Sequence, residues 1–143
     1  GTRHMRRLLL AATLAIAAVA LPARAADNVT QLQKIDRVAG TGTVARDGDV
    51  VQVNYTVWLY DANAADHHGK EVDSSLDSGE PISFTLGAGQ VIAGWDQGIR
   101  GMHVGGKRTL LVPARLAYGS RGAGADVPPN ASLVFDVELV GVH

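Results

Sequence analysis

Two long segments alternate between apolar and polar residues at every second position. One side of residues 49–60 carries five apolar residues: Val51, Val53, Tyr55, Val57 and Leu59. One side of residues 131–142 carries four more: Leu133, Phe135, Val137 and Leu139. A period of two is typical of a strand that buries one side and exposes the other. Both segments are therefore predicted to be strands of an antiparallel sheet with one solvated face.

Shorter apolar runs predict three further strands, at residues 31–38, 82–86 and 107–112. One helix is predicted to begin near Val91, because four apolar residues with nearly helical spacing follow a glycine-rich turn: Val91, Ile92, Trp95 and Ile99. Three glycines weaken this helix and then end it, so it should be short: Gly94, Gly98 and Gly101.

The remaining connections are predicted to be loops, at residues 61–70, 77–81 and 119–129. Strands with a single short helix indicate an α+β fold. We therefore expect a curved antiparallel β-sheet wrapped over one short α-helix.

The N-terminal segment has the pattern of a secretory signal peptide. Arg6 and Arg7 precede an uninterrupted run of small and apolar residues, 8–21, and Ala23-Arg24-Ala25 matches a cleavage site. Residues 1–4 resemble a cloning scar before Met5. These features predict a division of the chain into a scar (1–4), a signal peptide (5–25) and one domain (26–143). The domain is expected to be exported to a bacterial periplasm and to be free of the membrane after the signal peptide is cleaved.

Composition excludes several classes of function. The 143 residues suit one domain, and the absence of cysteine excludes disulfides and thiolate chemistry. Residues 26–143 contain 9 basic and 14 acidic residues, a net charge of −5. Because nucleic-acid affinity comes mainly from clustered Lys and Arg, no nucleic-acid partner is expected.

Other catalytic motifs fail on closer inspection. Residues 101–107 begin like a phosphate-binding loop, but Arg108 occupies the position of the magnesium-binding Ser or Thr. Ser74, Ser75 and His103 lack the G-x-S-x-G motif that presents a nucleophilic serine. Residues 66–68, Asp-His-His, form at most an opportunistic zinc or nickel site, because neighbouring side chains rarely close a tetrahedral site alone. No metal or cofactor is expected.

Seven short motifs occur in a characteristic order: Val53-Asn-Tyr55-Thr, Val72-Asp73-Ser-Ser, Phe84-Thr-Leu-Gly87, Val91-Ile92-Ala-Gly-Trp95, Ala117-Tyr118-Gly119, Pro128-Pro129 and Leu133-Val-Phe135-Asp-Val-Glu138. This series resembles the FKBP-type peptidyl-prolyl cis-trans isomerases over nearly all of residues 32–143. The resemblance implies a half-barrel of antiparallel strands around a short helix, in agreement with the alternation. It also implies isomerisation of X-Pro bonds in folding proteins.

The resemblance assigns a role to each site residue. Trp95 would form the floor of the proline pocket, and the hydroxyl of Tyr118 would donate a hydrogen bond at its edge. Asp73 would lie at the edge beside Tyr55, hold neighbouring groups in place and interact with the twisting amide. The Ile92 N–H would meet a substrate carbonyl. The pocket walls would be Tyr55, Phe84, Val91, Ile92 and Phe135. The substrate-binding rim would comprise Val72, Ile82 and Val127.

Five positions depart from the family pattern. Val72 and Ile82 replace aromatic residues, and Val57 replaces a glycine. Ala123 and Asp126 replace bulkier residues in the loop over the substrate, and residues 62–68 resemble an insertion. These changes predict a shallower, less aromatic groove. The expected partners are proline-containing polypeptides, with rapamycin- or tacrolimus-type macrolides as further ligands.

Two other interpretations remain open. The groove of a chaperone or docking module would hold chains without catalysis, as the changes at Val72 and Asp126 allow. The second interpretation is a surface isomerase like the macrophage infectivity potentiators. Against it, the sequence shows no long N-terminal dimerisation helix before the domain. We therefore expect a monomer.

Overall fold

Six antiparallel strands form one sheet in the computed structural model, which describes residues 28–143. The strands are β1 (Gln33–Val38), β2 (Val50–Tyr60), β3 (His68–Ser74), β4 (Ile82–Thr85), β5 (Lys107–Val112) and β6 (Leu133–Val142). They pair in the order β1-β5-β6-β2-β3, and β4 also pairs with β2. The α+β fold with a curved antiparallel sheet is thereby confirmed. The expected scar and signal peptide lie outside the described residues.

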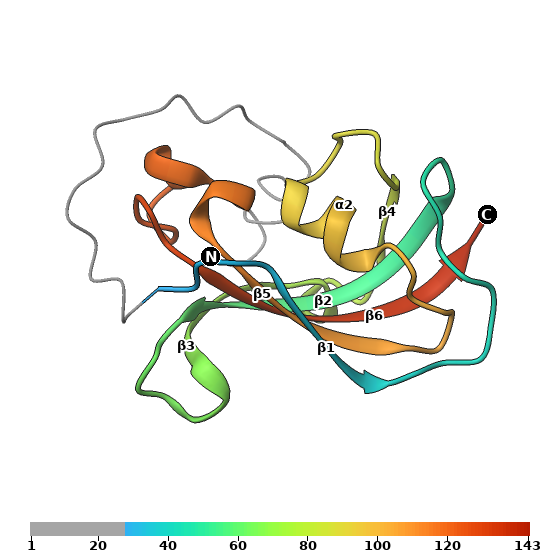
Figure 1. Ribbon diagram of the computed structural model, residues 1–143, viewed down its shortest axis with the longest axis horizontal. Helices are drawn as coiled ribbons and strands as arrows, with labels where there is room; N and C mark the ends of the chain where they lie inside the picture. Colours follow the sequence, from blue (N-terminus) through green and yellow to red (C-terminus); the bar gives the residue numbers. More distant parts are fainter. Residues whose placement is uncertain (1–27) are drawn as a thin grey trace.

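One α-helix, α2 (Ala93–Ile99), lies against one face of this sheet (Figure 1). Four short 3₁₀ helices complete the described elements: η3 (Ala65–His67), η4 (Ser75–Asp77), η5 (Ala114–Leu116) and η6 (Gly119–Arg121). Within residues 28–143, no helix combines the length and apolar character needed to span a bilayer.

The core lies between α2 and the sheet. The alternating residues of β2 that were predicted to be apolar on one face, from Val51 to Val57, are at most 2% exposed. They join Trp95 and Ile99 of the helix in one cluster. Since burial of a large apolar side chain contributes about 1.5–3 kcal/mol, this contact holds helix and sheet together.

Two helix glycines allow this close approach. A Cβ atom on Gly94 would lie 2.5 Å from Val112 Cγ1 and 3.1 Å from the carbonyl oxygen of Leu116. A Cβ atom on Gly98 would lie 2.7 Å from Leu110 Cδ1. The glycines therefore serve packing against β5, besides limiting the length of the helix.

Gly94→Ala is expected to lower the free energy of unfolding by about 1–2 kcal/mol, because overpacking outweighs the gain in helix propensity. Urea unfolding followed by tryptophan fluorescence measures the change. Gln97→Ala, at an exposed position of the same helix, is the control and should stay within about 0.5 kcal/mol of wild type. A Gly94→Ala variant as stable as this control would contradict the packing argument.

The structure differs from the predicted elements in two main places. Residues 68–70 belong to β3 instead of a loop, since His68 pairs with Tyr60 and Glu71 with Trp58. The strand was missed because Val72, Asp73 and Ser74 are all buried, which breaks the alternation. Other predicted loops contain short 3₁₀ helices at Asp77 and at Gly119–Arg121.

Candidate active site

Three aromatic rings surround the indole of Trp95. The ring of Tyr55 lies 5.1 Å away in an edge-to-face arrangement, and that of Phe135 lies 5.5 Å away in a similar one. Phe84 is tilted at 5.6 Å. Helix α2 and strands β2, β4 and β6 thus each contribute one ring. Such pairs add about 0.5–1.5 kcal/mol beyond their area burial, so the arrangement is well defined.

Asp73 lies at the edge of this aromatic cluster and is fully buried. Its Oδ2 accepts a hydrogen bond from the Tyr55 hydroxyl at 2.6 Å, and its Oδ1 accepts the Ser74 N–H at 2.8 Å. A buried carboxylate needs such donors to offset its loss of hydration. The expected proximity of Asp73 and Tyr55 is therefore present as a direct hydrogen bond.

Two serines tie β3 and η4 to β2 beside Asp73. The Ser75 hydroxyl accepts the Tyr55 N–H at 2.9 Å and donates to Asn54 Oδ1 at 2.9 Å. The Ser74 hydroxyl donates to the Tyr55 carbonyl at 3.1 Å. The two serines were predicted to be at most failed nucleophiles, whereas their hydroxyls hold the backbone of Tyr55.

Tyr118 is 4% exposed, and its hydroxyl has no hydrogen-bond partner among residues 28–143. Burial raises the pKa of this phenol above its ordinary value, and the negative charge of Asp73 raises the pKa further. Tyr118 is therefore a neutral donor at physiological pH. Trp95 Nε1 is likewise buried without a partner. Because buried donors are normally bonded, these two unbonded donors are available to an acceptor from a ligand.

Ile92 stands immediately before helix α2. Its carbonyl accepts the N–H groups of Trp95 at 3.0 Å and Asp96 at 3.3 Å. Within residues 28–143, no backbone acceptor is bonded to its own N–H. Ile92 is thus a third donor without a partner in this region, in accord with its expected role toward a carbonyl.

The structure brings ten of the eleven predicted site residues into one buried apolar cluster, and the eleventh, Asp73, is bonded to its member Tyr55. Val72, Ile82 and Val127, expected at the rim, are only 2–5% exposed, as deeply buried as the pocket walls. For Ile82 the reason is its register, since it pairs with inward-facing Val53. These three residues therefore lie inside the core and not at an exposed rim.

The loop after Tyr118 is braced by its own backbone. Ala123 and Val127 exchange two hydrogen bonds, of 2.8 and 3.1 Å. Asp126 forms an ion pair with Lys70 at 3.8 Å, which joins this loop to β3. Because Lys70 is largely exposed, the pair contributes little stability.

The adjacent histidines of the insertion face aromatic rings. His68 stacks on Trp58 at 3.8 Å, and His67 stacks on Tyr60 at 5.0 Å. In the described part of the chain, no group of three potential ligands is placed to hold a metal ion. The histidine pair therefore packs against β2.

A hollow of about 290 Å³ lies on the other face of the sheet, and Tyr55 is the one residue of the aromatic cluster that also lines it. Its polar side chains bond to one another, since Arg37 donates to the Thr109 hydroxyl and Thr109 donates to Asp136. Neither Trp95, Asp73 nor Tyr118 lines it. The buried aromatic cluster thus remains the better candidate for the site.

Comparison with known proteins agrees with this geometry. The family model for FKBP-type peptidyl-prolyl cis-trans isomerases matches residues 42–140. FK506-binding protein 2 of Candida glabrata is 60% identical over 98 residues, covering 68% of each chain. An FK506-binding protein of Neisseria meningitidis serogroup A is 47% identical, over 76% of this chain and 93% of its own.

Solved structures show the same fold. The crystal structure of AtFKBP13 matches with a TM-score of 0.69 and 41% identity, over 78% of this chain and 93% of its own. FkpA from Escherichia coli matches with a TM-score of 0.66 and 44% identity, over 78% of this chain but only 47% of its own. The chain belongs to the FKBP-type peptidyl-prolyl cis-trans isomerases.

Proposed function

We propose that this protein isomerises X-Pro bonds of folding polypeptides by enclosing the bond among the rings around Trp95. The observation that carries the proposal is the buried aromatic cluster beside three donors without acceptors, at Trp95, Tyr118 and Ile92. The apolar rings suit a proline ring, and the Ile92 N–H and the Tyr118 hydroxyl suit the flanking carbonyl groups.

The chemistry follows from amide resonance. Rotation about the C–N bond meets a barrier of about 18–20 kcal/mol, because the twisted bond loses its partial double-bond character. Water favours the more dipolar planar amide. An apolar pocket that excludes water therefore lowers the barrier to twisting. In such surroundings each remaining polar contact is stronger than in water.

The site residues divide this work. The rings of Tyr55, Phe84, Trp95 and Phe135 hold the proline. The Ile92 N–H anchors a substrate carbonyl, and the Tyr118 hydroxyl donates a second hydrogen bond. Asp73 holds the Tyr55 hydroxyl at 2.6 Å and thereby the Tyr55 ring against Trp95.

The same cluster is the proposed site for macrolides of the rapamycin or tacrolimus type, because several relatives are named FK506-binding proteins. Titration of the ¹⁵N-labelled protein with rapamycin tests this, since shifts should concentrate at Ile92 and around Tyr118. We also propose export, from the pattern of residues 5–25. N-terminal sequencing of secreted protein should find Ala26 first.

Tyr118→Phe is expected to lower kcat/KM for a proline tetrapeptide about 10-fold, because one hydrogen bond to the substrate is lost. A protease-free isomerisation assay measures it, with Tyr60→Phe on the outer part of β2 as the control. A variant with full activity would exclude the hydroxyl from the reaction, and wild-type protein at the uncatalysed rate would refute the proposed function.

The raised pKa of Tyr118 adds a pH dependence. Above about pH 10 the unfolded chain loses the phenolic proton while the folded protein keeps it, so stability falls as pH rises. Tyr118→Phe should remove that part of the alkaline destabilisation.

A further inference from the structure

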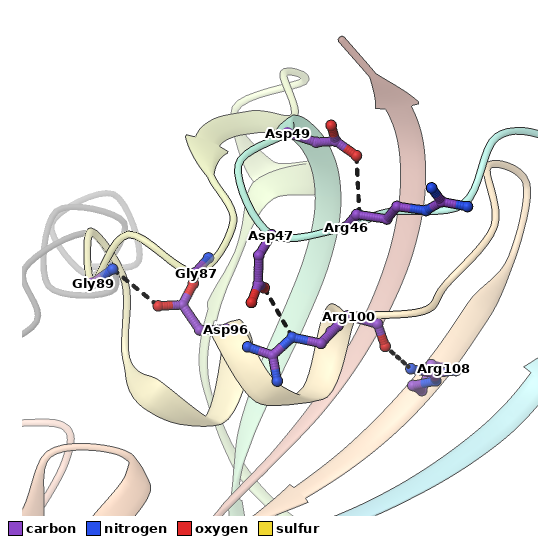
Figure 2. A network of polar contacts seen from close by, with 8 residues as sticks. All are labelled: Arg46, Asp47, Asp49, Gly87, Gly89, Asp96, Arg100 and Arg108. Carbon is purple, nitrogen blue, oxygen red and sulfur yellow. Dashed lines mark hydrogen bonds and ion pairs between the residues drawn. The ribbon is translucent and has the colours of Figure 1, made fainter.

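Asp96 holds the turn that leads into the site. Its carboxylate, on helix α2, accepts the Gly87 N–H through Oδ1 at 2.8 Å and the Gly89 N–H through Oδ2 at 3.1 Å. Figure 2 shows the side chain pointing from the helix into this turn. The side chain is buried, with the residue 9% exposed. A buried carboxylate that spans two backbone donors fixes both of their peptide groups.

The turn joins two parts of the proposed site. It begins after β4, which carries Phe84, and ends at Val91 and Ile92 immediately before the helix. Gly87 and Gly89 both have positive φ, of 82° and 73°, so the backbone path is one that only glycine adopts readily. Such a chain is flexible unless it is held. Apart from the Thr85 N–H bonded to Gln90 at 2.8 Å, Asp96 supplies the side-chain bonds found there.

Asp96 does not cap its own helix. Both of its partners lie outside α2, and Ile92, the N-cap residue, makes no side-chain capping bond. Its contacts therefore serve the turn and not the helix terminus.

The other end of the helix is anchored independently. Arg100 pairs with Asp47 at 2.8 Å, and Arg108 Nη1 donates to the carbonyl oxygen of Arg100 at 3.2 Å (Figure 2). Arg108 Nη1 also donates to the carbonyl oxygen of Gly98 at 2.8 Å. These contacts do not involve Asp96. Its loss should therefore loosen the turn while α2 remains in place.

We propose that Asp96 is a positioning residue for isomerisation, which fixes the Gly87–Ile92 turn so that the Ile92 N–H and the Phe84 ring keep their places around the substrate. This inference rests on the proposed function, because it needs the Ile92 N–H as the anchor of a substrate carbonyl. It adds a residue that touches neither substrate nor reacting bond.

The chemistry requires a carboxylate at this position. Its two oxygens accept two N–H donors at once, whereas an amide of the same size offers one oxygen and one NH₂ group. In Asp96→Asn, the NH₂ group would face one of the glycine N–H groups and repel it. This variant preserves shape and removes one of the two bonds.

The test combines backbone exchange with kinetics. In Asp96→Asn we expect amide hydrogen exchange at Gly87 and Gly89 to accelerate about 10-fold, and kcat/KM for a proline tetrapeptide to fall about 10-fold, as for one lost charge-assisted bond. Asp96→Glu, which keeps both oxygens on a longer arm, should recover part of the activity. Circular dichroism verifies that each variant is folded. If Asp96→Asn does not fold, Asp96→Ser is used in its place.

Asp36→Asn is the matched control, because it removes an exposed carboxylate that pairs with Arg108 and lies outside the turn. It should keep kcat/KM within twofold of wild type. If amide hydrogen exchange at Gly87 and Gly89 is unchanged in Asp96→Asn, the positioning role of Asp96 is refuted. It is also refuted if this exchange accelerates while kcat/KM stays unchanged. Neither outcome affects the proposed function. Wild-type protein that isomerises at the uncatalysed rate overturns the proposed function as well, so the two failures are distinguishable.

Discussion

Trp95→Ala is expected to lower the free energy of unfolding by about 3–5 kcal/mol and to reduce isomerisation to nearly the uncatalysed rate. Trp95 is 0% exposed and contacts the rings of Tyr55, Phe84 and Phe135. Truncation leaves a cavity in the centre of the core and removes the floor against which a proline ring would pack. Urea unfolding and the tetrapeptide assay measure the two effects.

Trp95→Phe separates the contribution of Trp95 to core packing from its contribution as the floor under the proline ring. The indole Nε1 has no hydrogen-bond partner in the described part of the chain, so phenylalanine loses apolar area but no internal bond there. We expect a smaller loss of stability, about 1–2 kcal/mol, and substantial residual activity. If Trp95→Phe is as stable as expected but inactive, the indole N–H contacts the substrate, and an apolar floor alone does not explain catalysis.

The alternation of apolar residues was enough to predict β2 and β6, and the nearly helical spacing of four apolar residues predicted the position of α2. In β2 and β6 each buried position is filled by an apolar side chain, so hydrophobicity reports orientation directly. The motif series then identified the cluster around Trp95, because its members come from separate elements in a recognisable order. Pattern and structure agree where burial is driven by apolar area.

Prediction failed where polar groups are buried. Residues 68–74 showed no strand pattern because Asp73 and Ser74 are buried and bonded to β2. The bonds from Asp96 to the Gly87–Ile92 turn were not predicted either, because a hydrophobic pattern gives no information about a buried carboxylate. The available signal was the Gly-Ala-Gly turn itself, whose N–H groups need an acceptor that an acidic residue a few positions later can supply.

The second large effect is expected from the loss of the buried hydrogen bond between Asp73 and Tyr55. Asp73→Asn should lower the free energy of unfolding by about 1.5–3 kcal/mol, because a buried charge-assisted bond is lost and the new NH₂ group faces the donor of Ser74 or Tyr55. It should also lower kcat/KM about 10–100-fold, because the Tyr55 ring loses the contact that holds it 5.1 Å from Trp95.

A double-mutant cycle with Tyr55→Phe decides how this pair acts. If the 2.6 Å bond between Tyr55 and Asp73 positions the ring, each single variant loses most of the effect and the double variant loses little more. The coupling energy should then be about 0.5–3 kcal/mol in both stability and activation free energy. If Tyr55→Phe retains activity while Asp73→Asn does not, the carboxylate acts on the twisting amide directly, and its bond to Tyr55 merely satisfies a buried charge.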